Sequence, residues 1–302
     1  MPNAISIDIG ENTMKAAVFG VKSETCKTVY KGPVQRRDIV GQISGIVDQH
    51  KGFDGIGVAA PGLLDANRGV IIRARNLGVE NLKIVDMLED RYNVPVFLSN
   101  DAVASVVGER FFGAGKKSKN IVYLTFSAGL ECGIIENDRV LLGKDGNAHE
   151  IGHCTIDASS EVRCGCGKYG HWEAFSSGNG IPVFARHLLD TKFKGRKSKL
   201  HGMKTITAKD VFDYAKSGDA AAKGIVAEIG RINALGVANI VELYDPELIT
   251  IGGAVALNNR SAVMGPIMSR VKGYTINRMP KITITPLGDM VTLYGAVADL
   301  LG

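Results

Sequence analysis

The sequence predicts a layered α/β fold built as two similar lobes. Short buried strands alternate with segments of helical spacing, as expected for helices that cover a sheet. A tight polar turn joins the first two strands. The same strand–turn–strand arrangement recurs later, since Thr125-Phe-Ser127 lies 117 positions after Asp8-Ile-Gly10. These observations predict a duplicated β-β-β-α-β-α unit.

Apolar runs and helical periodicity place the elements of the first half. The expected strands are Ala4–Ile9, Met14–Phe19, Cys26–Tyr30, Gly55–Ala60 and Val94–Leu98. The expected helices are Asp38–His50, Ile84–Tyr92 and Asp101–Phe111. We expect residues 1–112 to form the N-terminal lobe.

The second half repeats the strands and then becomes mainly helical. The expected strands are Asn120–Phe126, Cys132–Ile135 and Leu248–Ile251. The expected helices are Ile181–Leu189, Ala208–Ala215, Ala220–Leu243 and Val291–Leu300. We expect residues 113–289 to form the C-terminal lobe, and residues 290–302 to pack back on the N-terminal lobe.

The composition is that of a soluble globular protein. The 302 residues are 45% apolar and 22% charged, with a net charge of +5. The basic run Lys192–Lys199 has no aromatic series beside it, which favours a solvated loop over a nucleic-acid patch. No leader and no apolar run of membrane-spanning length are evident. We therefore expect a cytoplasmic protein with no nucleic-acid or membrane partner.

The loop from Glu150 to Glu173 carries the most informative motif. Thiolate and imidazole donors suit a closed tetrahedral zinc site. Gly165, Gly167 and Gly170 permit the tight turns that several ligands on one loop require. The expected ligands are His153, Cys164, Cys166 and His171. The five cysteines fit metal binding better than a disulfide framework.

We favour a zinc site that adjoins an active site, and two other interpretations of this loop are open. The first is a purely structural zinc knuckle. The other is a zinc protease, because His149-Glu150-Ile-Gly-His153 matches the His-Glu-x-x-His pattern. That pattern requires a helix, and the neighbouring glycines are poor helix formers. We therefore expect His149 to be a surface or pocket residue, and Trp172 to have a packing role.

Three further segments have features of ligand sites. Asp8-Ile-Gly10-Glu-Asn12-Thr-Met-Lys15 forms a polar hairpin that can hold phosphate, with Asp8 able to hold Mg²⁺. Asn100 and Asp101 follow a buried strand, so Asp101 is a candidate general base, although both residues are also good helix caps. Gly252-Gly253 permits close approach of a phosphate or a flat ligand, and close packing of the backbone explains the pair equally well.

This combination resembles the ROK family of sugar kinases, of the hexokinase–actin superfamily. The resemblance covers nearly the whole chain in order. It rests on the segments named above, together with Gly57-Val-Ala-Ala-Pro61-Gly62, Asn76-Leu77 and Thr125 to Gly133. It implies two actin-like lobes around a central cleft.

The resemblance also implies an activity and a set of roles. Asp101 would activate a hexose hydroxyl, usually the 6-hydroxyl, for phosphorylation by ATP with Mg²⁺. The sugar-binding residues would be Asn76, Asn100, Asp101, Glu150, His153 and Glu173. The nucleotide and phosphate residues would be Asp8, Gly10, Asn12, Lys15, Thr125, Gly129, Gly252 and Gly253. His153 would also bind a structural zinc ion, and the chain would form a homo-oligomer.

The chain departs from the family pattern at four places. His171 stands where the family usually has a third cysteine. Glu11 and Asn12 replace the usual Gly-Thr of the first turn, Ser127-Ala128-Gly129-Leu-Glu131 replaces Gly-Thr-Gly-x-Gly, and His149 replaces a small residue. Glucose is the first candidate substrate, with N-acetylmannosamine and fructose as alternatives. A non-catalytic sugar-binding regulator is a further alternative. Because the chain starts at the first strand, we expect no DNA-binding domain.

Overall fold

The computed structural model describes residues 3–301 and divides the chain into two compact units. The first unit consists of the described parts of 1–123, 133–149 and 285–302, and the second of 124–132 and 150–284. The boundary therefore falls within two neighbouring strands, and differs from the division at 112/113 expected from the sequence. Each unit is described by itself below.

A mixed five-stranded sheet forms the centre of the first unit, in the order β3-β2-β1-β4-β8. Strand β1 pairs antiparallel with β2 and parallel with β4, and β4 pairs parallel with β8. The strands are β1 Asn3–Ile9, β2 Thr13–Gly20, β3 Thr25–Pro33, β4 Gly55–Ala60 and β8 Val96–Asn100. All of them overlap the strands expected from the sequence.

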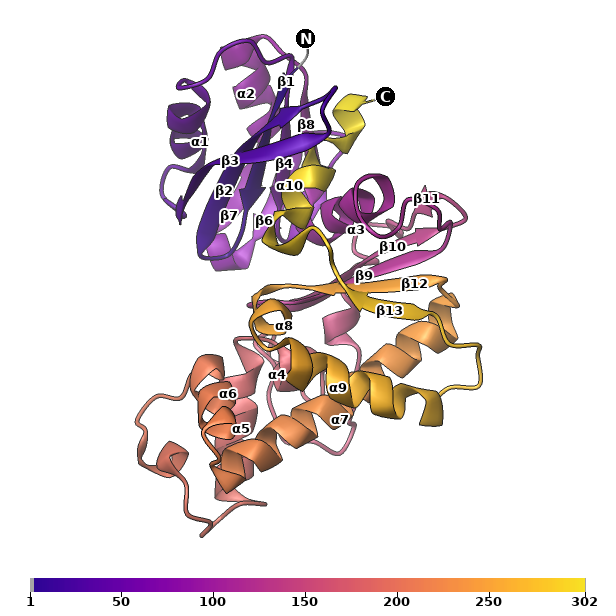
Figure 1. Cartoon of the computed structure of the whole chain (residues 1–302). Coiled ribbons are helices and arrows are strands. Elements are labelled where there is room, and N and C mark those ends of the chain that lie inside the picture. The colour runs from indigo at the N-terminus through magenta and orange to yellow at the C-terminus, as the bar shows by residue number, and fades with distance from the viewer. Residues whose placement is uncertain (1–2, 302) are drawn as a thin grey trace. The chain divides into compact units, whose positions relative to one another are not determined.

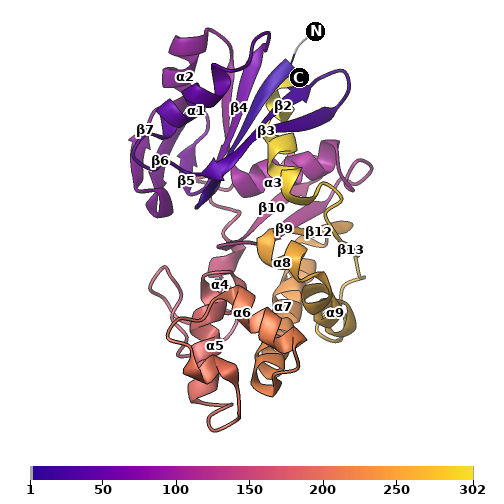
Figure 2. The same cartoon turned by 60° about the vertical axis from the view of Figure 1, so that its left-hand side comes forward.

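Alternation along β1 explains how both faces of this sheet are covered. Ile5, Ile7 and Ile9 belong to the core that includes helices α1 (Ile39–Val47) and α2 (Ile84–Tyr92). On the other face, the hydroxyl of Ser6 donates to the carbonyl of Leu293, 2.6 Å away in the C-terminal helix α10 (Val291–Ala296). Figures 1 and 2 show α1 and α2 on one side of the sheet and α10 on the other.

Helix α10 packs closely on helix α3 (Asp101–Phe111). A Cβ atom added at Gly295 would lie 1.6 Å from the carbonyl oxygen of Ala104, so only glycine permits this approach. The chain then ends in a 3₁₀ turn, Ala298–Leu301. The C-terminal segment thus helps to fix the helix that begins at Asp101.

A small antiparallel sheet in the first unit was not expected from the sequence. Its strands are β5 Leu63–Asp65, β6 Val70–Ala74 and β7 Val79–Leu82, with the 3₁₀ turn Arg75–Leu77 between the last two. These strands are three to five residues long and mostly half-buried. Such short segments give little periodic signal.

The second five-stranded sheet has the order β11-β10-β9-β12-β13, which repeats the pattern of the first sheet. This agreement supports the duplication expected from the two hairpins. Its strands are β9 Ile121–Phe126, β10 Leu130–Glu136, β11 Arg139–Val140, β12 Leu248–Gly252 and β13 Lys281–Ile284. The second unit holds the helices α4 Glu173–Ser176, α5 Gly180–Asp190, α6 Ala208–Lys216, α7 Ala220–Tyr244, α8 Ala254–Asn258 and α9 Arg260–Arg270.

Helix α7 is the central helix of the second unit. Within residues 3–301 it is the one helix long and apolar enough to cross a membrane by length and composition alone. However, 61% of its most apolar window is buried inside the chain. It packs against α4, α5, α6 and α9, as a core helix does (Figure 1).

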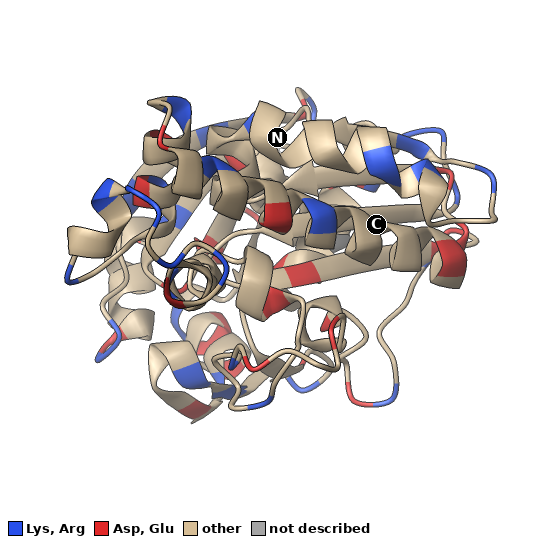
Figure 3. Cartoon of the chain, turned by 90° about the horizontal axis from the view of Figure 1, so that it is seen from below, with Lys and Arg blue, Asp and Glu red and all other residues tan. Residues whose placement is uncertain are grey.

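Charged residues of both signs are spread along the helices and loops, as Figure 3 shows. In the basic run at 192–199, Lys192 pairs with Glu228. The Arg196 guanidinium lies 5.2 Å from the centre of the Phe193 ring. The run is thus partly engaged with its own unit.

Candidate active site

Strand β8 and helix α3 place the candidate base in the first unit. Asn100 is the last residue of β8 and caps α3, because its side-chain Oδ1 accepts from the backbone N–H groups of Ala102 (2.9 Å) and Val103 (3.2 Å). Asp101 is the first residue of the helix and is half-buried. Its Oδ1 also accepts from the N–H of Ala102, at 3.0 Å.

The capping geometry leaves the side-chain nitrogen of Asn100 without a hydrogen-bond partner among residues 3–301. Asn100 is 6% exposed, and its Nδ2 is buried without a hydrogen-bond partner among the described residues. An unpaired buried amide is costly, so such groups are usually satisfied by a ligand or water. Asn100 is therefore a helix cap, as one interpretation of the sequence predicted, and its Nδ2 remains available to a ligand or a water molecule.

The zinc loop lies wholly in the second unit and brings its four expected ligands together. One donor atom from each of His153, Cys164, Cys166 and His171 lies within 4.8 Å of the others. Nδ1 of His153 is 3.8 Å from Sγ of Cys164, and Nδ1 of His171 is 3.3 Å from Sγ of Cys166. In a tetrahedral zinc site, donor atoms are about 3.3–3.8 Å apart. The donor set therefore fits a closed Cys₂His₂ zinc site.

Two of the three loop glycines are required by the backbone. Gly167 has φ 94° and Gly170 has φ 71°. A Cβ at Gly170 would also lie 2.0 Å from the carbonyl oxygen of Asp157. Gly165 has neither a positive φ nor a neighbour within 4 Å of an added Cβ, so the expectation that it is needed for the turn is wrong.

Two carboxylates adjoin the metal ligands. Oε2 of Glu150 is 3.5 Å from Nε2 of His153, and its carboxyl group has a raised pKa, because burial outweighs the lowering effect of His153. Oε2 of Glu173 accepts from the N–H of Leu130 (3.1 Å), and its Oε1 lies 3.5 Å from Sγ of Cys164. Both carboxylates therefore lie beside expected zinc ligands.

The first hairpin contains an ion pair. Nζ of Lys15 lies 3.2 Å from Oδ2 of Asp8 and donates to the carbonyl of Asp289 at 2.8 Å. Burial raises the pKa of the Asp8 carboxyl, although Lys15 acts in the opposite direction. Sequence reasoning missed Asp289, because 274 positions separate it from Lys15 and no local pattern links them.

The second turn and the glycine pair meet in the second unit. Gly253 has φ 83°, and a Cβ there would lie 2.4 Å from the Phe126 carbonyl oxygen and 2.6 Å from Oγ1 of Thr125. The turn is closed by the bond from the Ser127 N–H to the Gly129 carbonyl, at 2.9 Å. The expected residues Thr125, Gly129, Gly252 and Gly253 thus lie on two adjoining segments.

Two other residues singled out in the sequence, His149 and Asn76, differ in burial. His149 is 2% exposed, so it is a core residue and not a surface one. Burial lowers the pKa of its imidazole to about 4. No α-helix spans 149–153; the structure has only the 3₁₀ turn Ile151–His153, which removes the basis of the protease interpretation. Asn76 lies exposed in the first unit.

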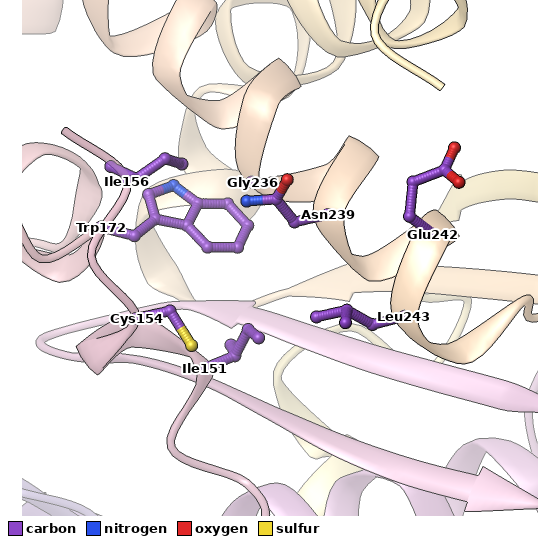
Figure 4. A pocket seen from close by; sticks show the side chains of 8 residues that line it. All are labelled: Ile151, Cys154, Ile156, Trp172, Gly236, Asn239, Glu242 and Leu243. Atoms are coloured by element: carbon purple, nitrogen blue, oxygen red, sulfur yellow. The ribbon is translucent and has the colours of Figure 1, made fainter. Parts of the chain in front are cut away.

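Trp172, near the end of the zinc loop, has the packing role expected of it. Its ring is 1% exposed and its Nε1–H donates to Oδ1 of Asn233 at 3.1 Å. It lines an apolar hollow of about 200 Å³ (Figure 4). The other residues of the hollow are Ile151, Cys154, Ile156, Gly236, Asn239, Glu242 and Leu243.

Several known proteins are similar to this chain. The chain is 36% identical over 246 residues to a glucokinase from Pyrobaculum calidifontis, covering 82% of this chain and 78% of that one. It is 28% identical to a xylose repressor from Caldicellulosiruptor bescii, covering 83% and 63%. The structure of a ROK family glucokinase from Streptomyces griseus in complex with glucose and AMPPNP matches with a TM-score of 0.83 at 27% identity, covering 99% and 98%.

The fold and the sites together define a protein of the actin-like class, and the predicted fold is confirmed. The family model described as ROK matches residues 4–300. The chain belongs to the ROK family.

Proposed function

We propose that this chain transfers the terminal phosphoryl group of ATP to the 6-hydroxyl of a hexose, with glucose as the first candidate. The chain is a sugar kinase, as its family and its glucokinase relatives indicate. The observation that carries the finer proposal is the pair Asn100–Asp101, where a half-buried carboxylate adjoins a buried amide donor that has no partner among residues 3–301.

In the proposed reaction Asp101 accepts the proton of the sugar hydroxyl as its oxygen bonds to the terminal phosphorus. The bond from that phosphorus to the bridging oxygen breaks, which releases ADP and a hexose 6-phosphate. Nδ2 of Asn100 donates to a neighbouring sugar oxygen and so orients the hydroxyl toward Asp101. Mg²⁺, when bound with ATP, would neutralise phosphate charge, and Asp8 is the residue proposed to hold it.

The second unit supplies the other proposed sugar contacts. Carboxylates are good acceptors for sugar hydroxyls, so Glu150 and Glu173 are proposed to bind the sugar, with His153 and, from the first unit, Asn76. The zinc ion is proposed to be structural, held by His153, Cys164, Cys166 and His171. Its function would be to fix the loop that carries these carboxylates.

A sugar panel tests this proposal. ADP release is coupled to a readout for glucose, mannose, fructose and N-acetylmannosamine, with ATP, ADP and polyphosphate compared as donors. Phosphorus and proton NMR of the product assigns the phosphorylated position. We expect turnover with ATP and glucose and a 6-phosphate product. Turnover by none of these sugars would refute the proposal.

A sugar-binding regulator is the second candidate. The xylose repressor relative supports it, and so do Glu11, Ala128 and Glu131, which replace residues of the usual phosphate turns. The two acids add negative charge where a phosphate would bind. Calorimetry distinguishes the candidates, because a regulator would bind sugar without measurable binding of ATP.

We also propose a cytoplasmic homo-oligomer whose partner is a hexose and not nucleic acid or a membrane. Exposed apolar side chains near the end of α7 support self-association: Leu243 is 67% exposed and Ile276 is 96% exposed. A hydrogen bond connects the segment of Ile276 to the end of α7, because the N–H of Ile276 donates to Oε1 of Glu242 at 2.7 Å. Light scattering coupled to size exclusion tests this, with a monomer as the contrary result.

A further inference from the structure

Arg36 lies beside the first phosphate turn, although it is distant from it in sequence. Nη2 of Arg36 donates to Oδ1 of Asn12 at 3.1 Å and to the carbonyl oxygen of Glu11 at 3.2 Å. The backbone holds the same segments together, since the N–H of Val34 donates to the carbonyl of Asn12 at 3.2 Å. The segment after β3 is therefore a wall of the turn between β1 and β2.

These contacts determine which way the Asn12 amide faces. Because Oδ1 accepts from a guanidinium, which can only donate, the two N–H groups of Nδ2 are directed elsewhere. Neither Nδ2 of Asn12 nor the remaining Nε and Nη1 donors of Arg36 have an acceptor among residues 3–301. Both side chains are exposed. The turn thus presents a set of donors with no protein acceptor.

The donors border a hollow that is large enough for an anion. The hollow has a volume of about 500 Å³ and is lined by Asn12 and by residues 33–38. Nε and Nη1 of Arg36 lie on different edges of the planar guanidinium, so each can donate one charge-assisted hydrogen bond to a phosphate oxygen. Main-chain N–H groups in tight turns add to such sites.

We propose that Arg36 and Asn12 form a phosphate clamp for the terminal phosphate of the phosphoryl donor, an inference that rests on the proposed kinase function. Position 12 has an amide where the resembling family usually has the hydroxyl of a threonine, and Glu11 adds a negative charge. Arg36 supplies the compensating charge and fixes Asn12 as a donor. The altered first turn then still binds phosphate, with Arg36 and Asn12 as its donors.

The test measures nucleotide binding and turnover separately in Arg36→Ala, Arg36→Lys and Asn12→Ala. Titration calorimetry with MgATP and with the non-hydrolysable analogue AMPPNP needs no turnover. Steady-state kinetics then give KM for ATP, KM for glucose and kcat. The control is Arg68→Ala, which removes one arginine charge from an exposed position in the same unit.

We expect Arg36→Ala to weaken binding of ATP about tenfold or more, the effect of losing a charge-assisted hydrogen bond. Glucose binding and the melting temperature should stay at wild-type values, which shows that the variant is folded. Lysine should restore less than half of the loss on a logarithmic scale, because a point charge cannot hold Asn12 and phosphate together. Arg68→Ala should change ATP binding less than twofold.

A double-mutant cycle tests the link to Asn12. Because Arg36 acts partly through Asn12, the double variant should lose less affinity than the product of the two single losses. Unchanged ATP affinity in Arg36→Ala, full restoration by lysine, or independent losses in the cycle would each overturn the clamp.

The same measurements separate this inference from the proposed function. If the wild type binds AMPPNP but phosphorylates no sugar, and Arg36→Ala loses that binding, the clamp stands and the hexose kinase proposal falls. If Arg36→Ala turns over normally at an unchanged KM for ATP, the kinase proposal stands and the clamp falls. A wild type that binds no nucleotide would overturn both.

Discussion

Nε2 of His153 lies 3.5 Å from Oε2 of Glu150. The other ring nitrogen, Nδ1, faces Sγ of Cys164 at 3.8 Å. A metal-bound histidine commonly donates its second N–H to a carboxylate, which orients both groups. This one ring therefore joins the zinc site to a carboxylate proposed to bind the sugar.

Loss of zinc should consequently weaken sugar binding. Cys164→Ser removes a buried ligand, so we expect the zinc content to fall from one ion per chain to near zero and the melting temperature to drop. The KM for glucose should rise about 10- to 100-fold, the usual range for disturbed outer-shell partners. Metal analysis and kinetics measure both.

The matched control is Cys26→Ser, which changes a cysteine of the first unit far along the chain from the loop. It should keep its zinc. Retention of zinc in Cys164→Ser would instead contradict the Cys₂His₂ assignment. It would favour the alternative zinc site, in which His149 and His153 are the ligands.

The buried imidazole of His149 should make the protein sensitive to acid. Burial lowers its pKa from 6.5 to about 4. As the pH falls below 6.5 the unfolded chain takes up a proton before the folded protein does, so the free energy of unfolding decreases until about pH 4. One such group accounts for about 3 kcal/mol over that range.

Urea unfolding at several pH values checks this in the wild type and in His149→Asn. The difference between the two proteins isolates His149 from the other titrating groups. The exposed His201 provides the control, since His201→Asn should leave the pH dependence unchanged. Parallel pH profiles for the wild type and His149→Asn would contradict the prediction.

Gly253 should tolerate no side chain. In Gly253→Ala the new Cβ would meet the Phe126 carbonyl oxygen at 2.4 Å in a backbone with φ 83°. We expect a loss of about 1–3 kcal/mol in the free energy of unfolding and weaker ATP binding.

Gly265 is the matched control, because it lies inside helix α9 with no neighbour within 4 Å of an added Cβ. Gly265→Ala should be neutral or stabilise by up to about 1 kcal/mol. Equal effects of the two substitutions, measured by thermal unfolding, would show that Gly253 has no special constraint.

Local patterns were enough to predict the strands and helices that hold the candidate site. The strand before Asn100 and the helix after it are regular enough to be recognised from apolar spacing, and the zinc ligands lie on one short loop. Contacts between distant positions carried no such signal. The contacts of Lys15 with Asp289 and of Arg36 with Asn12 could be recognised only in the folded structure. The burial of His149 likewise depends on packing that no local pattern records.

The most direct test of the central claim is the substitution Asp101→Asn, assayed for ADP release with glucose. Asn retains the shape and the helix start but cannot accept the hydroxyl proton at neutral pH. We predict that kcat falls by about 10²–10⁴-fold, while calorimetry finds glucose affinity within a few-fold of wild type. The control is Asp90→Asn, an exposed change on α2 that should leave kcat unchanged. A folded Asp101→Asn protein with wild-type kcat would contradict the account.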